Sequence, residues 1–182
     1  MPATARIHNF SAGPAILPLP VLEEAQRDLI SLPGVGMSVM EISHRSKTFE
    51  DFLNRAVEDI RALAGIPAHY KILMLQGGAT LQFSMVPMNL LGTGASADYI
   101  DTGSWSAKAI TEAKKVGTVN IVASTKTDKY RCIPAQHDLK LTPGAAYAHF
   151  TSNNTIESTQ WKVLPDVGDV PLVADTSSDM FS

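Results

Sequence analysis

The sequence predicts an α/β fold, a mostly parallel sheet with helices on both of its faces. From residue 70 onward, short apolar runs alternate with segments of helical periodicity. Strand, helix and strand in succession require crossover connections, which are typical of parallel strands. Hydrophobic residues make up 45% of the 182 residues and charged residues 18%, a composition that supports a sizeable core rather than disorder.

The N-terminal part is predicted to be an arm followed by two helices. We assign residues 1–19 to the arm, because prolines and a Gly-Pro pair gather toward its end. Pro20 suits the first turn of a helix over residues 21–32. A second helix is expected over residues 48–64, where apolar residues form one stripe, and Gly65-Ile66-Pro67 ends it.

The remainder of the chain supplies the strands and the helices between them. A helix is expected from Gly78 to about residue 91, and another over residues 105–115. Residues 126–142 are polar with weak periodicity, so we expect an irregular excursion there. The strand candidates are residues 71–75, 97–101, 118–123, 145–151 and 172–175.

Composition excludes several classes of protein. A formal net charge of −3 argues against a general nucleic-acid binder, which usually carries a basic face. No run approaches the roughly 20 apolar residues of a membrane span, and residues 1–10 lack the apolar core of a signal peptide. Cys132 is the single cysteine, so no internal disulfide is possible and a cytoplasmic protein is expected. The histidines show no metal-ligand spacing, so we predict no metal site.

Polar segments follow the strand candidates. In open sheets of this kind, ligands bind beyond the carboxyl ends of the strands. The segments that occupy this position are Gln76-Gly77, Thr102-Gly103-Ser104, Ser152-Asn153 and Asp175. We therefore expect them to meet at one edge of the sheet.

The segment Gly77-Gly78-Ala79-Thr80 follows a strand candidate and opens a predicted helix. Glycines allow a close backbone approach, and the free N–H groups of a helix start bind phosphate. The segment is neither a Walker loop nor the dinucleotide fingerprint, because the remaining residues of those motifs are missing. An ordinary glycine-rich turn is the alternative.

Asp175 ends an apolar strand candidate. A carboxylate there needs a partner, because burying an unpaired charge costs free energy. A protonated pyridine nitrogen is a suitable partner, since an ionised Asp keeps it protonated and makes the ring an electron sink. The alternatives are a helix N-cap and a metal ligand without companions.

Three further side chains complete the candidate site. The indole of Trp105 can stack on another aromatic ring, and the hydroxyl of Thr155 can bond a ring oxygen. Arg45, beside His44, offers a bidentate fork for a carboxylate or a phosphate. The alternatives are a core tryptophan, a turn in which Thr155 satisfies its own backbone, and a solvated arginine. Together the groups suit a phosphorylated, protonated pyridine ring.

The same motifs resemble a known family. In their order along the chain they are similar to those of the phosphoserine aminotransferase family, pyridoxal-phosphate enzymes of the class-V aminotransferase group. The resemblance covers essentially the whole chain, and its first two motifs are specific to this family. The segments that carry it are Asn9 to Pro14, His44 to Lys47, Gly77 to Phe83, Trp105, Ser152 to Ile156, and Val173 to Ser178.

The resemblance implies the fold of the aspartate aminotransferase superfamily (fold type I). Residues 20–182 would form the N-terminal part of its large pyridoxal-phosphate-binding domain, incomplete at the C-terminus. The residues that would hold pyridoxal 5′-phosphate are Ala79 and Thr80 at the phosphate, Trp105 on the pyridine ring, Thr155 near the ring oxygen, and Asp175 at the ring nitrogen.

The implied reaction moves an amino group between glutamate and 3-phosphohydroxypyruvate, giving 2-oxoglutarate and phosphoserine, in serine biosynthesis. Arg45 would hold an anionic group of the substrate, with His44 beside it. Family members are homodimers, so a homodimer is expected, with no nucleic-acid or membrane partner.

The chain departs from the family pattern at two places. Glycine often follows shortly after the Asn-Asn-Thr-Ile run, and Glu157-Ser158-Thr159 stands here instead. The family's Schiff-base lysine lies in a Gly-Ala-Gln-Lys-Asn motif downstream of the Asp175 segment, beyond Ser182. We therefore expect this chain to lack that lysine and to be inactive alone. The alternatives are a non-catalytic fragment that binds cofactor or dimerises, and another class-V aminotransferase or a desulfurase.

Overall fold

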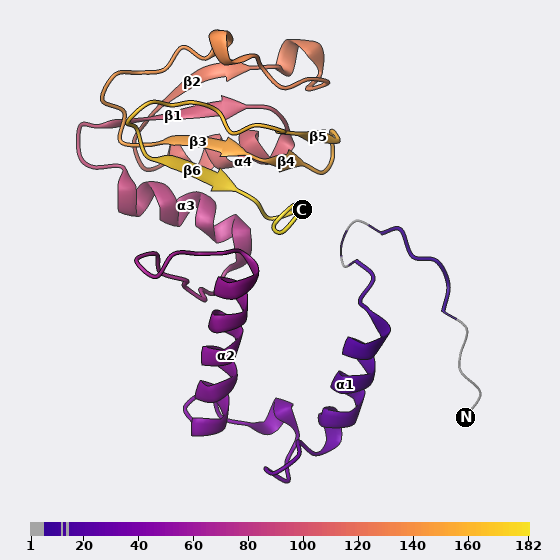
Figure 1. Ribbon diagram of the computed structural model, residues 1–182. Coiled ribbons are helices and arrows are strands. Elements are labelled where there is room, and N and C mark those ends of the chain that lie inside the picture. The colour runs from indigo at the N-terminus through magenta and orange to yellow at the C-terminus, as the bar shows by residue number, and fades with distance from the viewer. Residues whose placement is uncertain (1–5, 12, 14) are drawn as a thin grey trace. The chain divides into compact units, whose positions relative to one another are not determined.

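The computed structural model describes residues 6–11, 13 and 15–182. The chain forms two compact units, residues 1–73 and residues 74–182, and each is described by itself (Figure 1). Ala12 and Pro14 of the Asn-Phe-Ser-Ala-Gly-Pro motif lie outside the described residues.

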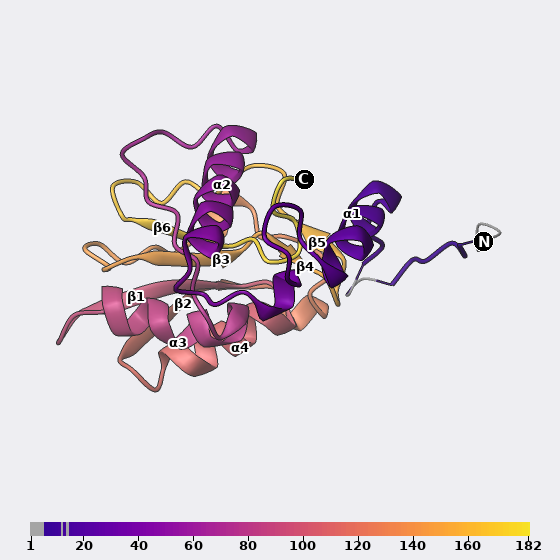
Figure 2. The ribbon, with the colours of Figure 1, turned by 90° about the horizontal axis from the view of Figure 1, so that it is seen from below.

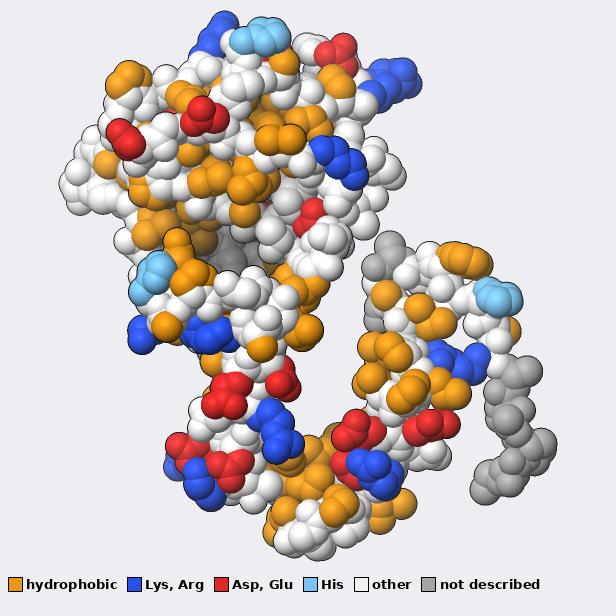
Figure 3. All heavy atoms as spheres, in the orientation of Figure 1, with side chains coloured by type: hydrophobic (Ala, Val, Ile, Leu, Met, Phe, Trp, Pro, Cys, Tyr) orange, Lys and Arg blue, Asp and Glu red, His pale blue; other side chains and the backbone are white. Residues whose placement is uncertain are grey.

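The described residues of the first unit form two α-helices, as predicted, joined through the short 3-10 helix η1 (Val39–Glu41). They are α1 (Leu19–Ile30) and α2 (Lys47–Leu63). Pro20 occupies the first turn of α1, and the Ser46 hydroxyl caps α2 by accepting a hydrogen bond from the N–H of Phe49 (3.2 Å). Neither helix has a buried residue, and apolar side chains gather openly along α1 (Figure 3).

The second unit is built on a parallel four-stranded sheet of order β2-β1-β3-β6. Every pairing in it is parallel, which confirms the predicted sheet type. A short antiparallel hairpin, β4-β5, follows β3. The strands are β1 (Ser96–Asp101), β2 (Thr118–Ser124), β3 (Ala148–Thr151), β4 (Asn153–Asn154), β5 (Thr159–Gln160) and β6 (Leu172–Asp175).

Two helices, α3 (Gly78–Leu90) and α4 (Ser104–Ala113), cover one face of this sheet (Figure 2). Successive residues of a strand point to opposite faces, so Tyr99 of β1 packs with Ile110 of α4 whereas Ile100 packs away from them. The hydroxyls of Tyr99 and Tyr147 share a buried hydrogen bond of 2.7 Å.

The opposite face is covered by irregular chain. Residues 126–142 contain only the short 3-10 helices η2 (Lys126–Asp128) and η3 (Gln136–Asp138), in keeping with the predicted excursion. Leu139 and Leu141 nevertheless pack against the buried side chain of Phe150. This stretch therefore completes the second half of the core.

One predicted strand is wrong. Residues 71–75 have no strand structure, and Leu73, Met74 and Leu75 are 70%, 50% and 52% exposed. A strand requires a neighbour to satisfy its backbone groups, and within the described residues no strand pairs with this segment. The sheet consequently has four of the five predicted strands, and the segment that precedes α3 is not part of the sheet. The strand predicted over 145–151 also begins later, at Ala148.

Candidate functional site

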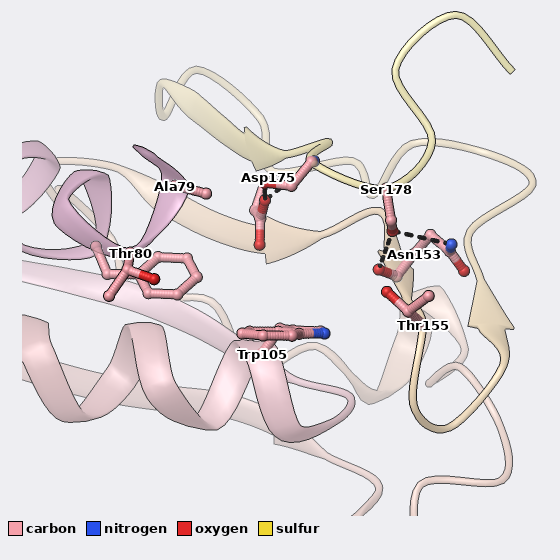
Figure 4. Close-up of a pocket in the computed structure, with 9 residues that line it drawn as sticks. Ala79, Thr80, Trp105, Asn153, Thr155, Asp175 and Ser178 are labelled. Atoms are coloured by element: carbon pink, nitrogen blue, oxygen red, sulfur yellow. Dashed lines mark hydrogen bonds between the residues drawn. The ribbon is translucent and has the colours of Figure 1, made fainter. Parts of the chain in front are cut away.

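One cavity of about 270 Å³ gathers the predicted cofactor residues of the second unit. It lies beyond the carboxyl end of β6, beside the first turns of α3 and α4 (Figure 4). Ala79, Thr80, Trp105, Thr155 and Asp175 all line it. Phe83, Asn153, Ser177 and Ser178 complete the lining. Of the segments expected to meet at one edge of the sheet, Asn153 and Asp175 line this cavity directly, and Trp105 lies next to a third.

The first turn of α3 supplies backbone donors. Gly77 precedes the helix with φ +94°, a conformation that favours glycine, and a Cβ there would strike the side chain of Leu81. The first intrahelical bond runs from the N–H of Leu81 to the Gly77 carbonyl (3.3 Å). The preceding amides, including those of Ala79 and Thr80, therefore have no partner within the helix. They form the positive end of the helix dipole and suit an anion.

Asp175 supplies a carboxylate that is fixed through one oxygen. It ends β6 beside Thr151 of β3 and is half-buried rather than buried. Its Oδ1 accepts hydrogen bonds from the N–H and the hydroxyl of Ser177, at 3.2 and 2.6 Å. The side chain points across the cavity toward Trp105 (Figure 4). The carboxylate is thereby oriented while Oδ2 stays available to a ligand.

Trp105 forms the opposite wall from the first turn of α4. The hydroxyl of Ser106 accepts hydrogen bonds from the N–H groups of Thr102 and Gly103, both at 2.9 Å, and so orders the turn between β1 and α4. The ammonium of Lys108 lies 4.4 Å from the centre of the indole ring, within the range of a cation–π interaction. The ring presents a flat surface to the cavity (Figure 4).

Thr155 stands in the turn between β4 and β5. This turn is tied to the segment after β6, because the amide of Asn153 donates to the hydroxyl of Ser178 (3.0 Å) and that hydroxyl donates to the Asn153 carbonyl (3.1 Å). Ser158 completes the turn with φ +59°. In the segment Glu157-Ser158-Thr159, where the family often has glycine, Ser158 thus adopts a left-handed conformation that favours glycine.

His44 and Arg45 lie in the first unit, on the exposed turn before α2. The N–H of Arg45 donates a hydrogen bond to the hydroxyl of Ser43 (3.2 Å), and Arg45 is exposed to solvent. The predicted substrate contact of these residues remains a prediction.

Sequence reasoning missed two groups near the cavity. The carboxylate of Glu157 binds the first residue of α4, a contact between distant segments that no local pattern signals. His149, buried on β3 and stacked on Tyr99 with ring centres 4.8 Å apart, lines an adjoining cavity together with Asp175. Burial lowers the pKa of His149 to about 4, against the opposing effect of the Asp175 charge.

Residues 6–11, 13 and 15–182 contain neither a membrane-spanning helix nor a metal cluster. No helix there combines the length and apolar character that crossing a bilayer requires. In that part of the chain, no three His, Cys, Asp or Glu side chains come together in a way that suits a metal ion.

Comparison with known families gives a match over nearly the whole chain. The family model for aminotransferase class-V matches residues 7–181. The phosphoserine aminotransferase of Desulfatibacillum aliphaticivorans is 56% identical over 178 residues, which are 97% of this chain and 49% of the relative. That of Lysinibacillus sphaericus is 53% identical, with 98% and 49% covered. The chain thus spans about half the length of the curated relatives it matches.

Solved structures show the same relationship. Phosphoserine aminotransferase from Bacillus circulans subsp. alkalophilus superimposes with a TM-score of 0.89 and 47% identity, over 93% of this chain and 47% of the other. The pyridoxal-phosphate-bound enzyme from Trichomonas vaginalis has a TM-score of 0.87 and 38% identity, over 96% and 49%. The predicted α/β architecture is therefore that of known aminotransferases.

Proposed function

Because the chain belongs to the class-V aminotransferase family, we propose that its cavity binds pyridoxal 5′-phosphate in an amino-group transfer. The substrates are glutamate and 3-phosphohydroxypyruvate, and the products 2-oxoglutarate and phosphoserine, as in serine biosynthesis. One observation carries the proposal: a free helix start, a flat indole, a hydroxyl and an anchored carboxylate line one cavity. The 56% and 53% identity with two phosphoserine aminotransferases over nearly the whole of this chain supports this choice of substrates.

The residues present fit the cofactor. The amides of Ala79 and Thr80 bind its phosphate at the positive end of α3. Trp105 stacks on the ring, and the Thr155 hydroxyl bonds near the ring oxygen. Asp175 accepts a hydrogen bond from the protonated ring nitrogen on Oδ2, the oxygen that Ser177 does not bind. When bound, the cofactor supplies an electron sink for the carbon that carries the amino group.

The side chains of this chain hold and orient the cofactor and the substrate, and the charges of Asp175 and Arg45 suit these two tasks. The Asp175 carboxylate keeps a proton on the ring nitrogen because an opposite charge stabilises it. Arg45, with His44 beside it, binds an anionic group of the substrate; all the proposed substrates carry carboxylates, and a planar guanidinium matches that geometry. The turn before α2 exposes both side chains for this contact.

We further propose that the protein acts as a homodimer in the cytoplasm, without nucleic-acid or membrane partners. Phe49, Phe52 and Leu53 of α2 are 38%, 39% and 38% exposed, and their spacing places them on one face of the helix, where a partner could cover them. A second copy is the occupant that a family of homodimers favours. Residues 20–182 would then form the N-terminal part of the large cofactor domain, after an arm of residues 1–19.

The test of activity uses a fusion in which this chain is followed by the C-terminal half of the Desulfatibacillum aliphaticivorans relative, called here the fusion protein. With pyridoxal phosphate and glutamate, it should convert 3-phosphohydroxypyruvate to phosphoserine, and pyruvate should be a poor substitute. Turnover of pyruvate at the same rate would reject the proposed specificity. Failure of the 182-residue chain to bind pyridoxal phosphate in a fluorescence titration would contradict the assignment of the cavity.

A second candidate function is cofactor binding without turnover. It is favoured by one observation: none of the described residues that line the cavity is a lysine. The fusion protein and the chain alone separate the two functions, because only the first should release 2-oxoglutarate.

A further inference from the structure

We propose that Glu157 is a positioning residue that joins the Thr155 turn to the first turn of α4 and so holds the Trp105 ring at the cavity. Its Oε1 accepts hydrogen bonds from the N–H of Ser104 (2.9 Å) and from the Ser104 hydroxyl (2.5 Å). Ser104 directly precedes Trp105, and Glu157 lies two residues after Thr155. One carboxylate thus connects two walls of the same cavity.

The chemistry of this contact favours a strong link. Ser104 is the first residue of α4, and its N–H is one of the donors that a helix start leaves unsatisfied. The N-cap residue, Gly103, has no side chain with which to bind it. A carboxylate at this end of a helix is stabilised by the dipole and by charge-assisted hydrogen bonds. Glu157 therefore caps α4 from a distant segment.

Close packing fixes the second oxygen of Glu157. A Cβ at residue 103 would strike both the amide of Asn154 and Oε2 of Glu157, so both side chains lie against the bare Cα of Gly103. Asn154 is fully buried, and its Nδ2 donates to the hydroxyl of Thr102 (3.0 Å). The close approach is possible only because residue 103 is glycine.

Two buried oxygens meet at this point without a donor. Neither Oε2 of Glu157 nor Oδ1 of Asn154 has a hydrogen-bond partner among the described residues, and an unsatisfied buried oxygen is costly. A half-turn of the Asn154 amide exchanges its oxygen and its nitrogen. Oδ1 then faces the Thr102 hydroxyl, which can donate to it. Nδ2 takes the place of Oδ1 beside Gly103, so that a donor stands on the side where Oε2 of Glu157 lies.

The consequence for the site is orientation of the indole. Trp105 is half-exposed, so packing alone does not determine its position, and the helix turn that carries it must be held. Without the carboxylate, the Ser104 amide loses its acceptor and the Thr155 turn loses its attachment to α4. The expected effect on ligand binding rests on the cofactor role proposed for Trp105. The expected effect on the position of the indole does not.

The test uses the full chain with Trp161→Phe, which leaves Trp105 as the single tryptophan. Two quantities are measured: the acrylamide quenching constant of Trp105 without ligand, and the dissociation constant of pyridoxal phosphate. Glu157→Ala should raise the quenching constant at least about twofold and weaken binding about tenfold, the effect of losing one charge-assisted hydrogen bond. Glu157→Gln keeps an oxygen acceptor for Ser104 and should stay within about twofold of the parent in both measurements.

Asp169→Ala is the matched control, because it also removes one carboxylate of the second unit, from an exposed site. It should change neither quantity. Equal effects of Glu157→Ala and Asp169→Ala, or an equal loss in Glu157→Gln and Glu157→Ala, would overturn the inference. If the parent chain binds no pyridoxal phosphate, the proposed function fails while the quenching comparison still decides the role of Glu157.

Ser104→Ala gives an independent measurement if circular dichroism shows Glu157→Ala to be unfolded. It removes the hydroxyl donor but keeps the N–H bond, so a smaller change, about threefold, is expected in ligand binding. Where Glu157→Ala is folded, the effects of Glu157→Ala and Ser104→Ala should be less than additive in the double variant, because the two groups share one interaction. No change in Ser104→Ala, or full additivity, would count against the link.

Discussion

The indole ring of Trp105 and the carboxylate of Asp175 face each other across one cavity (Figure 4). Trp105 lies in the first turn of α4, directly after β1, and Asp175 ends β6. In the sheet, β3 lies between β1 and β6. Parallel strands bring their carboxyl ends to the same edge, so residues distant in sequence meet there. A planar ring between them would have its face on the indole and its edge on the carboxylate.

This arrangement makes Asp175 the residue whose charge matters most. Asp175→Asn in the fusion protein should keep the fold but lose about 10²-fold or more of kcat, since the amide cannot hold a proton on the ring nitrogen. The measurement is steady-state transamination with glutamate. Asp169→Asn, an exposed control, should retain full activity. Near-parental turnover of Asp175→Asn would rule out the proposed role.

Most of the sheet could be predicted because its strands are short segments that carry apolar residues and are bounded by turn residues. Residues 71–75 have the same local signal and form no strand. Apolar composition indicates that a segment can form a strand, but a strand also needs a neighbouring strand to pair with. The whole fold determines whether that neighbour is present. The failure at this segment is therefore one of tertiary context rather than of local propensity.

The site was predictable to the extent that its residues follow strands. Trp105 and Asp175 could be placed at one edge because parallel topology alone brings strand ends together. Glu157 could not, since its partner Ser104 lies on another element and nothing in a turn sequence indicates a distant N–H. The half-exposed state of Asp175 also required the structure, because an apolar run before it suggests burial.

Arg45 is expected to contribute to substrate binding. In the fusion protein, Arg45→Ala should raise KM for glutamate or for the phosphorylated keto acid. The rise should correspond to a loss of about 1.5–3 kcal/mol in binding free energy, which is the contribution of one charge-assisted hydrogen bond. Arg55→Ala, at an exposed position of α2, serves as control and should leave KM unchanged. An unaltered KM for both substrates in Arg45→Ala would reject the contact.

Ser158 is expected to be replaceable with a gain in stability. Its φ of +59° is left-handed, a conformation that costs a residue with a Cβ roughly 1–2 kcal/mol. Glycine avoids this cost but loses more backbone entropy, so Ser158→Gly should raise the free energy of unfolding by about 0.5–1 kcal/mol. Urea denaturation measures it. Ser31→Gly, at φ −153°, should instead be neutral or destabilising, and the same sign at both positions would refute the explanation.

His149 is expected to make stability depend on pH. Burial lowers its pKa to about 4 from 6.5, so between these values the unfolded chain binds a proton that the folded chain excludes. The free energy of unfolding therefore rises with pH in this window. The stability that neutral His149 supports is complete above about pH 6.5 and falls as pH drops toward 4, by on the order of 3 kcal/mol.

The comparison of His149→Gln with the parent isolates this effect. The variant should show a shallower dependence of unfolding free energy on pH between about 4.5 and 7, measured by urea denaturation. His137→Gln is the control, because the side chain of His137 is 85% exposed and its loss should leave the slope unaltered. An unchanged slope in His149→Gln would show that other groups set the pH dependence.

The last prediction concerns covalent attachment of the cofactor. A covalent bond between the protein and the cofactor requires a lysine amine at the cofactor's aldehyde carbon. None of the described residues lining the cavity is a lysine. Lys108 comes near, over the Trp105 ring, but it lines the neighbouring hollow between α3 and α4. Borohydride reduction of the 182-residue chain with pyridoxal phosphate should therefore label several lysines, each well below one per chain. Lys108→Gln should leave that pattern otherwise unchanged. Stoichiometric labelling of one lysine, with turnover of glutamate, would instead show that the chain carries its own catalytic amine, because only an amine held at the aldehyde reacts so selectively.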